Sequence, residues 1–129
     1  YDLLMIIDVI EHVENYYDFL RKIIKIGKYK LFHIPLDLSV QYILRGSPLI
    51  KKRRDVGHIH YFAKETALAV LEDTGYKIID FSYTSSSVDL PARSIKSFLF
   101  KFPRKILFAL NRNIAVRLLG GYSLMVLTK

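Results

Sequence analysis

The residues best suited to chemistry are the acids and the histidine of segment 8–12, which has the sequence DVIEH and directly follows a strongly apolar run. An imidazole titrates near neutral pH, so His12 could remove a proton from an acceptor group. We take His12 as the candidate catalytic base, with a hydrogen bond to a neighbouring loop as its alternative role. Glu11 and Glu14 could form a carboxylate pair, but acids at the start of a helix also stabilise its dipole. We assign both glutamates to that stabilising role.

A second group of histidines lies further along the chain, at His58 and His60. On an extended segment, a spacing of two places both rings on the same face, where they could bind a metal together with His33 or Asp37. Two histidines without a fixed third ligand are weak evidence for a metal centre. We therefore favour structural or substrate-facing roles for this pair and predict no metal.

Basic residues are concentrated in segment 51–54, which has the sequence KKRR, and in segment 91–119, where seven basic residues meet no acidic one. A solvated surface, a nucleic-acid contact and an anionic membrane are the three interpretations. Nucleic acid is not favoured because the nearby aromatic residues show no stacking motif. A lipid surface has more support, since phenylalanines accompany the charges and residues 104–118 separate apolar from charged positions. The simplest alternative is a helix whose apolar arc packs over the sheet or the mouth of the active site.

The composition describes a single compact domain of 129 residues, 51% apolar and 25% charged. Because there are 0 cysteines, disulfide scaffolds, cysteine-bound metals and thiol catalysis are excluded, and a reducing, cytoplasmic setting is expected. No uncharged apolar stretch reaches the roughly 18 residues that a membrane-spanning helix needs. The chain begins with Tyr1 and runs straight into an apolar segment, which we interpret as the start of a fragment.

Apolar periodicity predicts an α/β chain. We expect strands at residues 2–10, 29–34, 76–83 and 122–128, helices at 16–26 and 64–74, and a basic helical insertion at 91–119. The first strand should be buried on both faces of a parallel sheet because it has no polar alternation. The next helix should be capped by Asn15 and extend about three turns to Gly27. Pro35 should end the second strand, Pro103 should break the insertion, and residues 36–60 should form a long substrate-side loop.

The opening residues 1–13, with the sequence YDLLMIIDVIEHV, resemble the fourth strand and the following turn of class I S-adenosylmethionine-dependent methyltransferases, particularly the small-molecule group of types 11 and 12. The likeness continues through the helix that ends at Gly27. It includes the strand 31–35, LFHIP, and the segment 57–62, GHIHYF. It covers nearly all of the chain outside the loop and the insertion.

The resemblance implies an α/β fold that is the C-terminal half of a Rossmann-like methyltransferase sheet, with strands in the family order 4-5-7-6. The last strand, 122–128, would be antiparallel and would lie between the strands at 29–34 and 76–83. The cofactor implied for the complete protein is S-adenosylmethionine, with Ile7, Asp8 and Val9 beside its methionine end. The substrate would be a small-molecule methyl acceptor.

On the acceptor side, we expect His33, Pro35, His58 and Tyr61 to bind the substrate. The family's glycine-rich turn and its ribose-binding acid have no counterpart here, and no two glycines form a G-x-G cluster. We therefore expect a partial domain that binds the cofactor weakly alone and can self-associate through its first strand. The alternative function is a noncatalytic interaction or membrane-surface module that uses the basic insertion, peripheral at an anionic membrane.

Overall fold

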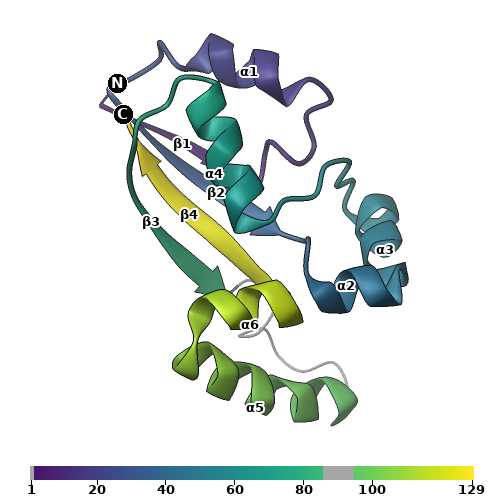
Figure 1. Cartoon of the computed structure of the whole chain (residues 1–129). Helices are drawn as coiled ribbons and strands as arrows, with labels where there is room; N and C mark the ends of the chain where they lie inside the picture. Colours follow the sequence, from purple (N-terminus) through teal and green to yellow (C-terminus); the bar gives the residue numbers. More distant parts are fainter. Residues whose placement is uncertain (1, 86–94) are drawn as a thin grey trace.

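The computed structural model describes residues 2–85 and 95–129, so the first four residues of the expected insertion, 91–94, lie outside the described residues. Its centre is a four-stranded sheet in the order β1-β2-β4-β3 (Figure 1). β1 (Leu3–Ile7) pairs in parallel with β2 (Tyr29–Leu36). β4 (Tyr122–Thr128) lies antiparallel between β2 and β3 (Ile78–Ser85). This topology confirms the predicted fold class and the antiparallel last strand.

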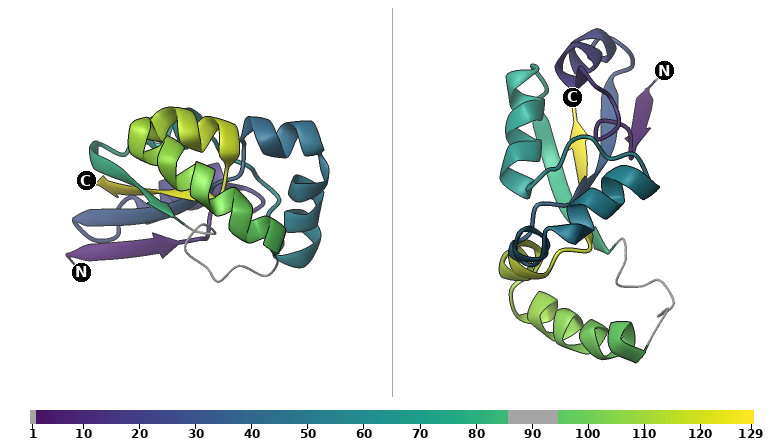
Figure 2. Two further views of the ribbon diagram at one scale, coloured as in Figure 1. Left: turned by 90° about the horizontal axis from the view of Figure 1, so that it is seen from below. Right: turned by 90° about the vertical axis from the view of Figure 1, so that its right-hand side faces the viewer.

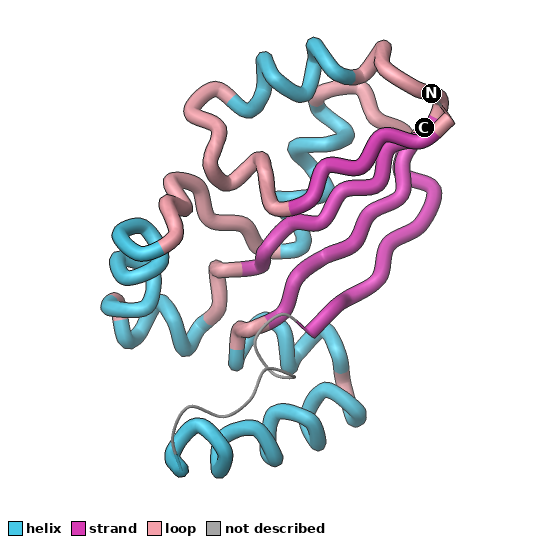
Figure 3. The backbone as a smooth tube through the Cα atoms, turned by 180° about the vertical axis from the view of Figure 1, so that it is seen from behind, coloured by secondary structure: helices cyan, strands magenta, loops and turns pink. Residues whose placement is uncertain are grey.

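Helices α1 (Tyr16–Ile23) and α4 (Lys64–Asp73) cover one face of the sheet. Alternate residues of the two central strands point into the core beneath them, among them Phe32 and Ile34 of β2 and Leu124 of β4. Leu20 of α1 and Leu71 of α4 complete this core. Seen from behind, the opposite face of the sheet has no helix across it (Figure 3). Hydrophobic burial in the described part of the chain is therefore one-sided.

The first strand is not buried on both faces, and that prediction is wrong for this chain. Leu3, Met5 and Ile7 are 46%, 58% and 41% exposed. Only the alternate side chains, Leu4 and Ile6, contact the core. The reason is position: β1 is an edge strand, and no described element covers the open face of the sheet. Its continuous apolar sequence therefore presents an exposed apolar edge.

Helix α1 begins where the sequence predicted, but it is shorter than three turns. The side chain of Asn15 accepts a hydrogen bond from the backbone N–H of Asp18, and the helix ends after eight residues. Buried Lys30 donates from Nζ to the carbonyl oxygens of Ile24 and Gly27. This cation stabilises the carboxyl end of α1, where the helix dipole is negative.

Residues 36–60 are not an irregular loop, because they contain α2 (Val40–Arg45) and α3 (Ser47–Asp55). The side chain of Ser39 caps α2, and Gly46, with φ 63°, connects the two helices. Neither helix buries a residue fully, so the sequence shows no strong apolar period there. Local signals rather than a core-facing stripe define these helices: the Ser39 cap for α2 and Pro48 in the first turn for α3.

The second strand continues past Pro35 to Leu36, so Pro35 does not end it. Asp8 donates its backbone N–H to the carbonyl of His33, so the polar groups of residue 33 face β1. Backbone polar groups alternate in direction along a strand, so those of residue 35 also point toward the β1 side, but at a position beyond the end of β1. A missing N–H is therefore tolerated at Pro35.

The insertion forms two helices, α5 (Ile95–Leu110) and α6 (Arg112–Leu119), and Pro103 does not break it because it lies inside α5. The break is at Asn111, whose side chain accepts from the backbone N–H of Ile114 and so begins a new helix. Both helices lie beyond one end of the sheet (Figure 2). No helix among the described residues is long and apolar enough to cross a membrane.

The apolar arc of residues 106–118 does not pack into the core, as one interpretation of the sequence required. Leu110 is 78% exposed, and the nearby Phe102 is 71% exposed. Ile106, Ile114 and Leu118 are exposed as well. The buried residues of α6 are instead Ala115 and Val116.

Candidate functional site at the carboxyl edge of the sheet

The carboxyl ends of β1, β2 and β3 lie along one edge of the sheet, since these three strands run in the same direction. Ligands of open α/β sheets bind outside this edge. The corner 8–12 follows β1, Asp37 follows β2, and helices α2, α3, α5 and α6 lie beyond the edge (Figures 1 and 2). The topology therefore brings most of the predicted site residues to one end of the molecule.

Asp8 is the one non-glycine residue with a positive φ among the described residues, at 50°. Its carboxylate oxygen Oδ1 lies 2.7 Å from His33 Nδ1, and His33 Nε2 lies 2.9 Å from the hydroxyl oxygen of Thr84. A neutral His33 with its proton on Nδ1 satisfies both bonds, donating to Asp8 and accepting from Thr84. The strained backbone of Asp8 is thus held in place by a polar chain that reaches β3.

The other two residues expected at the cofactor lie on either side of Asp8. Ile7 is exposed at the end of β1. Val9 is half-buried, and its carbonyl accepts the backbone N–H of His12 at 3.0 Å. Together with Asp8, these residues offer an apolar and polar surface at the uncovered end of the edge strand.

His12 makes the loop contact that its alternative role required, and one ring nitrogen remains outside that contact. Nδ1 lies 2.9 Å from the carbonyl oxygen of Gly57, so this nitrogen carries a proton and donates it. In the neutral ring, Nε2 then carries the lone pair. The side chain is 37% exposed, and Nε2 lies 3.8 Å from Glu11 Oε1. The geometry leaves Nε2 able to accept a proton or to bind a ligand.

Glu11 is the residue that sequence reasoning misassigned. Both Glu11 and Glu14 precede Asn15, the N-cap of α1, so neither lies in the first turn of the helix. Glu11 is completely buried, and neither carboxylate oxygen has a hydrogen-bond partner among the described residues. Burial raises the pKa of the Glu11 carboxyl and is the largest effect; the residue's own backbone N–H lowers this pKa by less, and the nearby charge of Asp8 raises it by less again.

The side chain of His58 faces Glu11 and His12 from the other side of the site. His58 Nδ1 lies 2.6 Å from Asp37 Oδ2, and the ammonium of Lys52 lies 2.6 Å from Asp37 Oδ1. The imidazole rings of His12 and His58 meet edge to face with their centroids 4.9 Å apart. Two ordinary backbone hydrogen bonds, from Ile59 N–H and His60 N–H to the Glu11 carbonyl, hold the two segments together.

His60 and Tyr61 have other partners. His60 Nε2 lies within hydrogen-bond distance of the carbonyl oxygens of Val13 and Glu14, at 3.0 and 3.2 Å. The hydroxyl of Tyr61 donates to the carbonyl of Leu49 in α3 at 3.2 Å. His58 and His60 therefore do not share a site, and Tyr61 fixes the position of α3 beside it.

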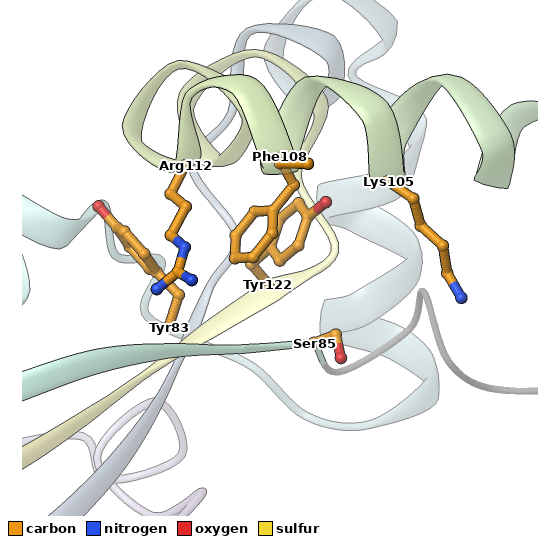
Figure 4. Close-up of a pocket in the computed structure, with 7 residues that line it drawn as sticks. Tyr83, Ser85, Lys105, Phe108, Arg112 and Tyr122 are labelled. Atoms are coloured by element: carbon orange, nitrogen blue, oxygen red, sulfur yellow. The ribbon is translucent and has the colours of Figure 1, made fainter.

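A pocket of about 520 Å³ lies between α5 and the ends of β3 and β4 (Figure 4). Phe108 and Tyr122 stack in it with ring centroids 4.7 Å apart. Lys105 and Arg112 supply cationic groups to its lining. A second pocket of about 370 Å³ lies against α2 and α3 and includes His58 in its lining. Of these two pockets, the second touches the cluster of Glu11, His12 and His58, through His58.

No protein-family model matches this sequence, and no curated protein matches it. Solved structures do match. An S-adenosylmethionine-dependent methyltransferase from Archaeoglobus fulgidus is 18% identical over 99% of this chain, with a TM-score of 0.55. One from Thermotoga maritima is 14% identical over 99% of the chain, with a TM-score of 0.59. A cyclopropane synthase from Mycobacterium tuberculosis is 14% identical over 99%, with a TM-score of 0.57.

This chain spans only 58%, 56% and 55% of those three structures. The agreement extends over nearly all of this chain, so the part that lacks a counterpart belongs to the larger proteins. The sheet order β1-β2-β4-β3 and the antiparallel β4 are the arrangement that the sequence resemblance implied. The chain therefore has the α/β fold of the C-terminal half of a class I S-adenosylmethionine-dependent methyltransferase.

Proposed function

We propose that this chain is the C-terminal half of an S-adenosylmethionine-dependent methyltransferase that acts on a small molecule. The observation that supports the proposal most is the sheet order, with β4 inserted antiparallel between β2 and β3, in a chain that aligns along its length with such enzymes. The polar residues gathered at the carboxyl edge agree with this proposal, because ligands of open α/β sheets bind there.

The residues at the end of β1 fit one wall of a cofactor pocket. Ile7 is exposed and Val9 is half-buried, which provides apolar contact, and the Asp8 carboxylate is half-exposed beside them. When bound, the cofactor would supply an electrophilic methyl group on its sulfonium. The other walls would come from polypeptide that this chain does not contain, since it has no G-x-G turn. We expect weak cofactor binding by the isolated chain.

His12 is the proposed base at this site. Methyl transfer requires the acceptor atom to be aligned with the donor, and a hydroxyl acceptor must also lose its proton. The bond from Nδ1 to Gly57 orients the ring and directs the Nε2 lone pair away from that loop. Nε2 can then accept the proton of the acceptor.

The acceptor would lie at the carboxyl edge, where His33, Pro35, His58 and Tyr61 are the proposed substrate-side residues. Its body would extend into the pocket of about 370 Å³ that includes His58, where the apolar lining and the basic side chains of Lys51 and Lys52 suit an apolar molecule that carries an acidic group. A lipid-like acceptor would meet both requirements.

The test of this function uses the longer protein that supplies the remaining cofactor pocket. We expect His12→Gln to lower the rate of methyl transfer to a hydroxyl acceptor by about 10²- to 10⁴-fold, while the dissociation constant of S-adenosylmethionine changes little. The matched control is His60→Gln, which keeps a donor toward the two carbonyls that His60 contacts. Unchanged turnover in His12→Gln would show that His12 is not the base.

A second candidate function is a noncatalytic module that binds an anionic membrane surface. It is supported by the exposed apolar residues of α5 and α6, such as Phe102 and Leu110, beside the basic residues of the same helices. This combination of apolar and cationic side chains is typical of helices that lie at a lipid interface. Membrane binding by these helices would also suit the first proposal if the methyl acceptor were itself a lipid.

A further inference from the structure

We propose that Glu11, His12 and His58 form a binding site for one divalent transition-metal ion of the zinc class. One ligand atom from each residue lies within 4.8 Å of the other two. Around a tetrahedral zinc with bonds of about 2.0–2.1 Å, ligand atoms are about 3.4 Å apart. Small side-chain rotations would therefore bring the three atoms to bonding distance.

The two imidazoles are already oriented as metal ligands. His12 donates from Nδ1 to the carbonyl of Gly57, and His58 has its Nδ1 2.6 Å from the Asp37 carboxylate. Metal-binding histidines almost always use the second ring nitrogen in this way, which fixes the ring and makes the ligating nitrogen more basic. These bonds engage Nδ1 of both residues, so Nε2 is the nitrogen that would bind the metal, and that of His12 lies 3.8 Å from Glu11 Oε1.

The carboxylate of Glu11 gives an independent indication of a missing partner. It is completely buried, and neither oxygen has a hydrogen-bond partner among the described residues. An unpaired buried carboxylate is costly, and buried charges are normally paired or bound to metals. A divalent cation between Glu11 and the two histidines would neutralise this charge.

The backbone also holds the two halves of the site in register. The carbonyl of Glu11 accepts hydrogen bonds from Ile59 at 2.9 Å and His60 at 3.1 Å, which keeps the segment containing His58 against the corner at 8–12. Lys52 occupies the second oxygen of Asp37, so that carboxylate is committed to orienting His58. The proposed ligands are thus positioned before any ion binds.

The sequence alone predicts no metal, because the spacing pairs His58 with His60 and the position of Glu11 suggests a role at the start of the helix. His33 is excluded as a ligand in this arrangement because both of its ring nitrogens are already engaged, Nδ1 by Asp8 and Nε2 by Thr84. One carboxylate and two imidazoles suit a borderline ion such as Zn²⁺ rather than Ca²⁺ or Mg²⁺, which prefer oxygen ligands.

Three protein ligands leave a coordination position open, as in catalytic rather than structural zinc sites. The exposed side of His12 is where a water or an acceptor oxygen could reach the ion. If the proposed methyltransferase function holds, the ion would activate an acceptor hydroxyl as a Lewis acid, and His12 would serve as a ligand instead of a base. The metal site itself does not depend on that function.

The experiment is a titration of the 129-residue chain, stripped with a chelator, with Zn²⁺ by calorimetry and with Co²⁺ by visible absorption. We expect one equivalent of metal per chain, a dissociation constant at or below the micromolar range and a tetrahedral Co²⁺ spectrum. Glu11→Gln and His58→Ala should each weaken binding at least tenfold. Asp37→Asn should weaken it by about 10- to 100-fold, as expected for a partner that orients a ligand.

His60→Gln is the matched control, because it changes a histidine two residues from His58 that has other partners. It should leave metal affinity unchanged. Absence of saturable one-to-one binding would overturn the proposal, and so would equal losses in His58→Ala and His60→Gln, which would indicate an adventitious ion only. For any variant that folds poorly, the increase in melting temperature of the unaltered chain on adding Zn²⁺ provides a second readout, and no increase would also overturn the proposal.

These titrations contain neither S-adenosylmethionine nor acceptor, so the two proposals fail separately. Metal binding without methyl transfer by the longer protein would reject the proposed function and leave the metal site. Methyl transfer that persists after chelation, with no binding in the titration, would reject the metal site and leave the function.

Discussion

Asp37 and His58 are joined by a hydrogen bond of 2.6 Å between Oδ2 and Nδ1, although they lie 21 residues apart in the sequence. The bond connects the residue after β2 to the loop after α3. Asp37 also pairs with Lys52, so its buried carboxylate binds both the ammonium of Lys52 and the imidazole of His58, which belong to the same segment of the chain. It therefore fixes α3 and the site histidine together.

Replacing that carboxylate should destabilise the chain. Asp37→Asn removes the charge that faces Lys52 and weakens the bond to His58. We expect the free energy of unfolding to fall by about 2 kcal/mol. This loss is smaller than the usual value for fully buried ion pairs because Lys52 is partly exposed. Urea denaturation measures this loss. Lys52→Gln should cost less because the bond between Asp37 and His58 remains, and a larger loss in Lys52→Gln would contradict this account.

Tyr76 should make the chain sensitive to alkaline pH. Its hydroxyl donates to the carbonyl of Leu20 at 2.7 Å, and burial raises the pKa of Tyr76 from 10.0 to about 12. The unfolded chain then loses this proton at lower pH than the folded chain does. Stability should therefore fall as the pH rises from about 10 to about 12, by roughly 2–3 kcal/mol for a shift of this size.

Urea denaturation at several alkaline pH values tests this dependence, with Tyr76→Phe as the comparison. The variant should be about 1 kcal/mol less stable near neutral pH because it lacks the hydrogen bond. Its stability should change less between pH 10 and 12. Parallel pH curves for the two proteins would show that another group causes the alkaline loss.

The exposed edge of β1 should cause self-association. Leu3 and Met5 lie on an edge strand that is uncovered in the described structure, and such strands pair readily with other chains. We expect light scattering to show association that increases with protein concentration, and Met5→Lys to reduce it. Ile79→Lys, an equivalent change on the other edge strand β3, should have a smaller effect. A monodisperse monomer at all concentrations would contradict the prediction.

The helices of the insertion should bind anionic vesicles. Cosedimentation with vesicles rich in phosphatidylserine should decrease at high salt, because charge contributes to the attraction. Substituting the exposed Phe102 and Leu110 with serine should decrease it further, whereas the same change at exposed Ile43 and Leu44 of α2 serves as control. Binding unaffected by the α5 substitutions would remove the support for a membrane-surface function.

Most of the fold could be predicted from the resemblance of the opening residues to a known family, because each recognised strand has a fixed place in the sheet of that family. The position of β4 could be predicted in this way, and the cap at Asn15 from its residue type and the helical spacing that follows it. The break at Asn111 rather than Pro103 could not, because it depends on which local cap competes best with helix continuation. Similarly, α2 and α3 have no buried stripe that a periodicity could detect.

The candidate site was predictable in part. The corner at 8–12 and His58 stand out by residue type, but the burial of Glu11 and its separation from α1 are tertiary properties. The pairing of His58 with Asp37 instead of His60 depends on how the loop after α3 folds back. Spacing in the sequence cannot decide between such partners when they come from distant segments.

The central claim is that this chain supplies one side of an S-adenosylmethionine site. The most direct test is calorimetric titration of S-adenosylmethionine into the 129-residue chain and into a longer protein that adds the upstream polypeptide. We predict weak or undetectable binding by the chain alone and saturable one-to-one binding by the longer protein, reduced by Asp8→Ala. Sub-micromolar affinity of the isolated chain, or no binding by the longer protein, would contradict the account.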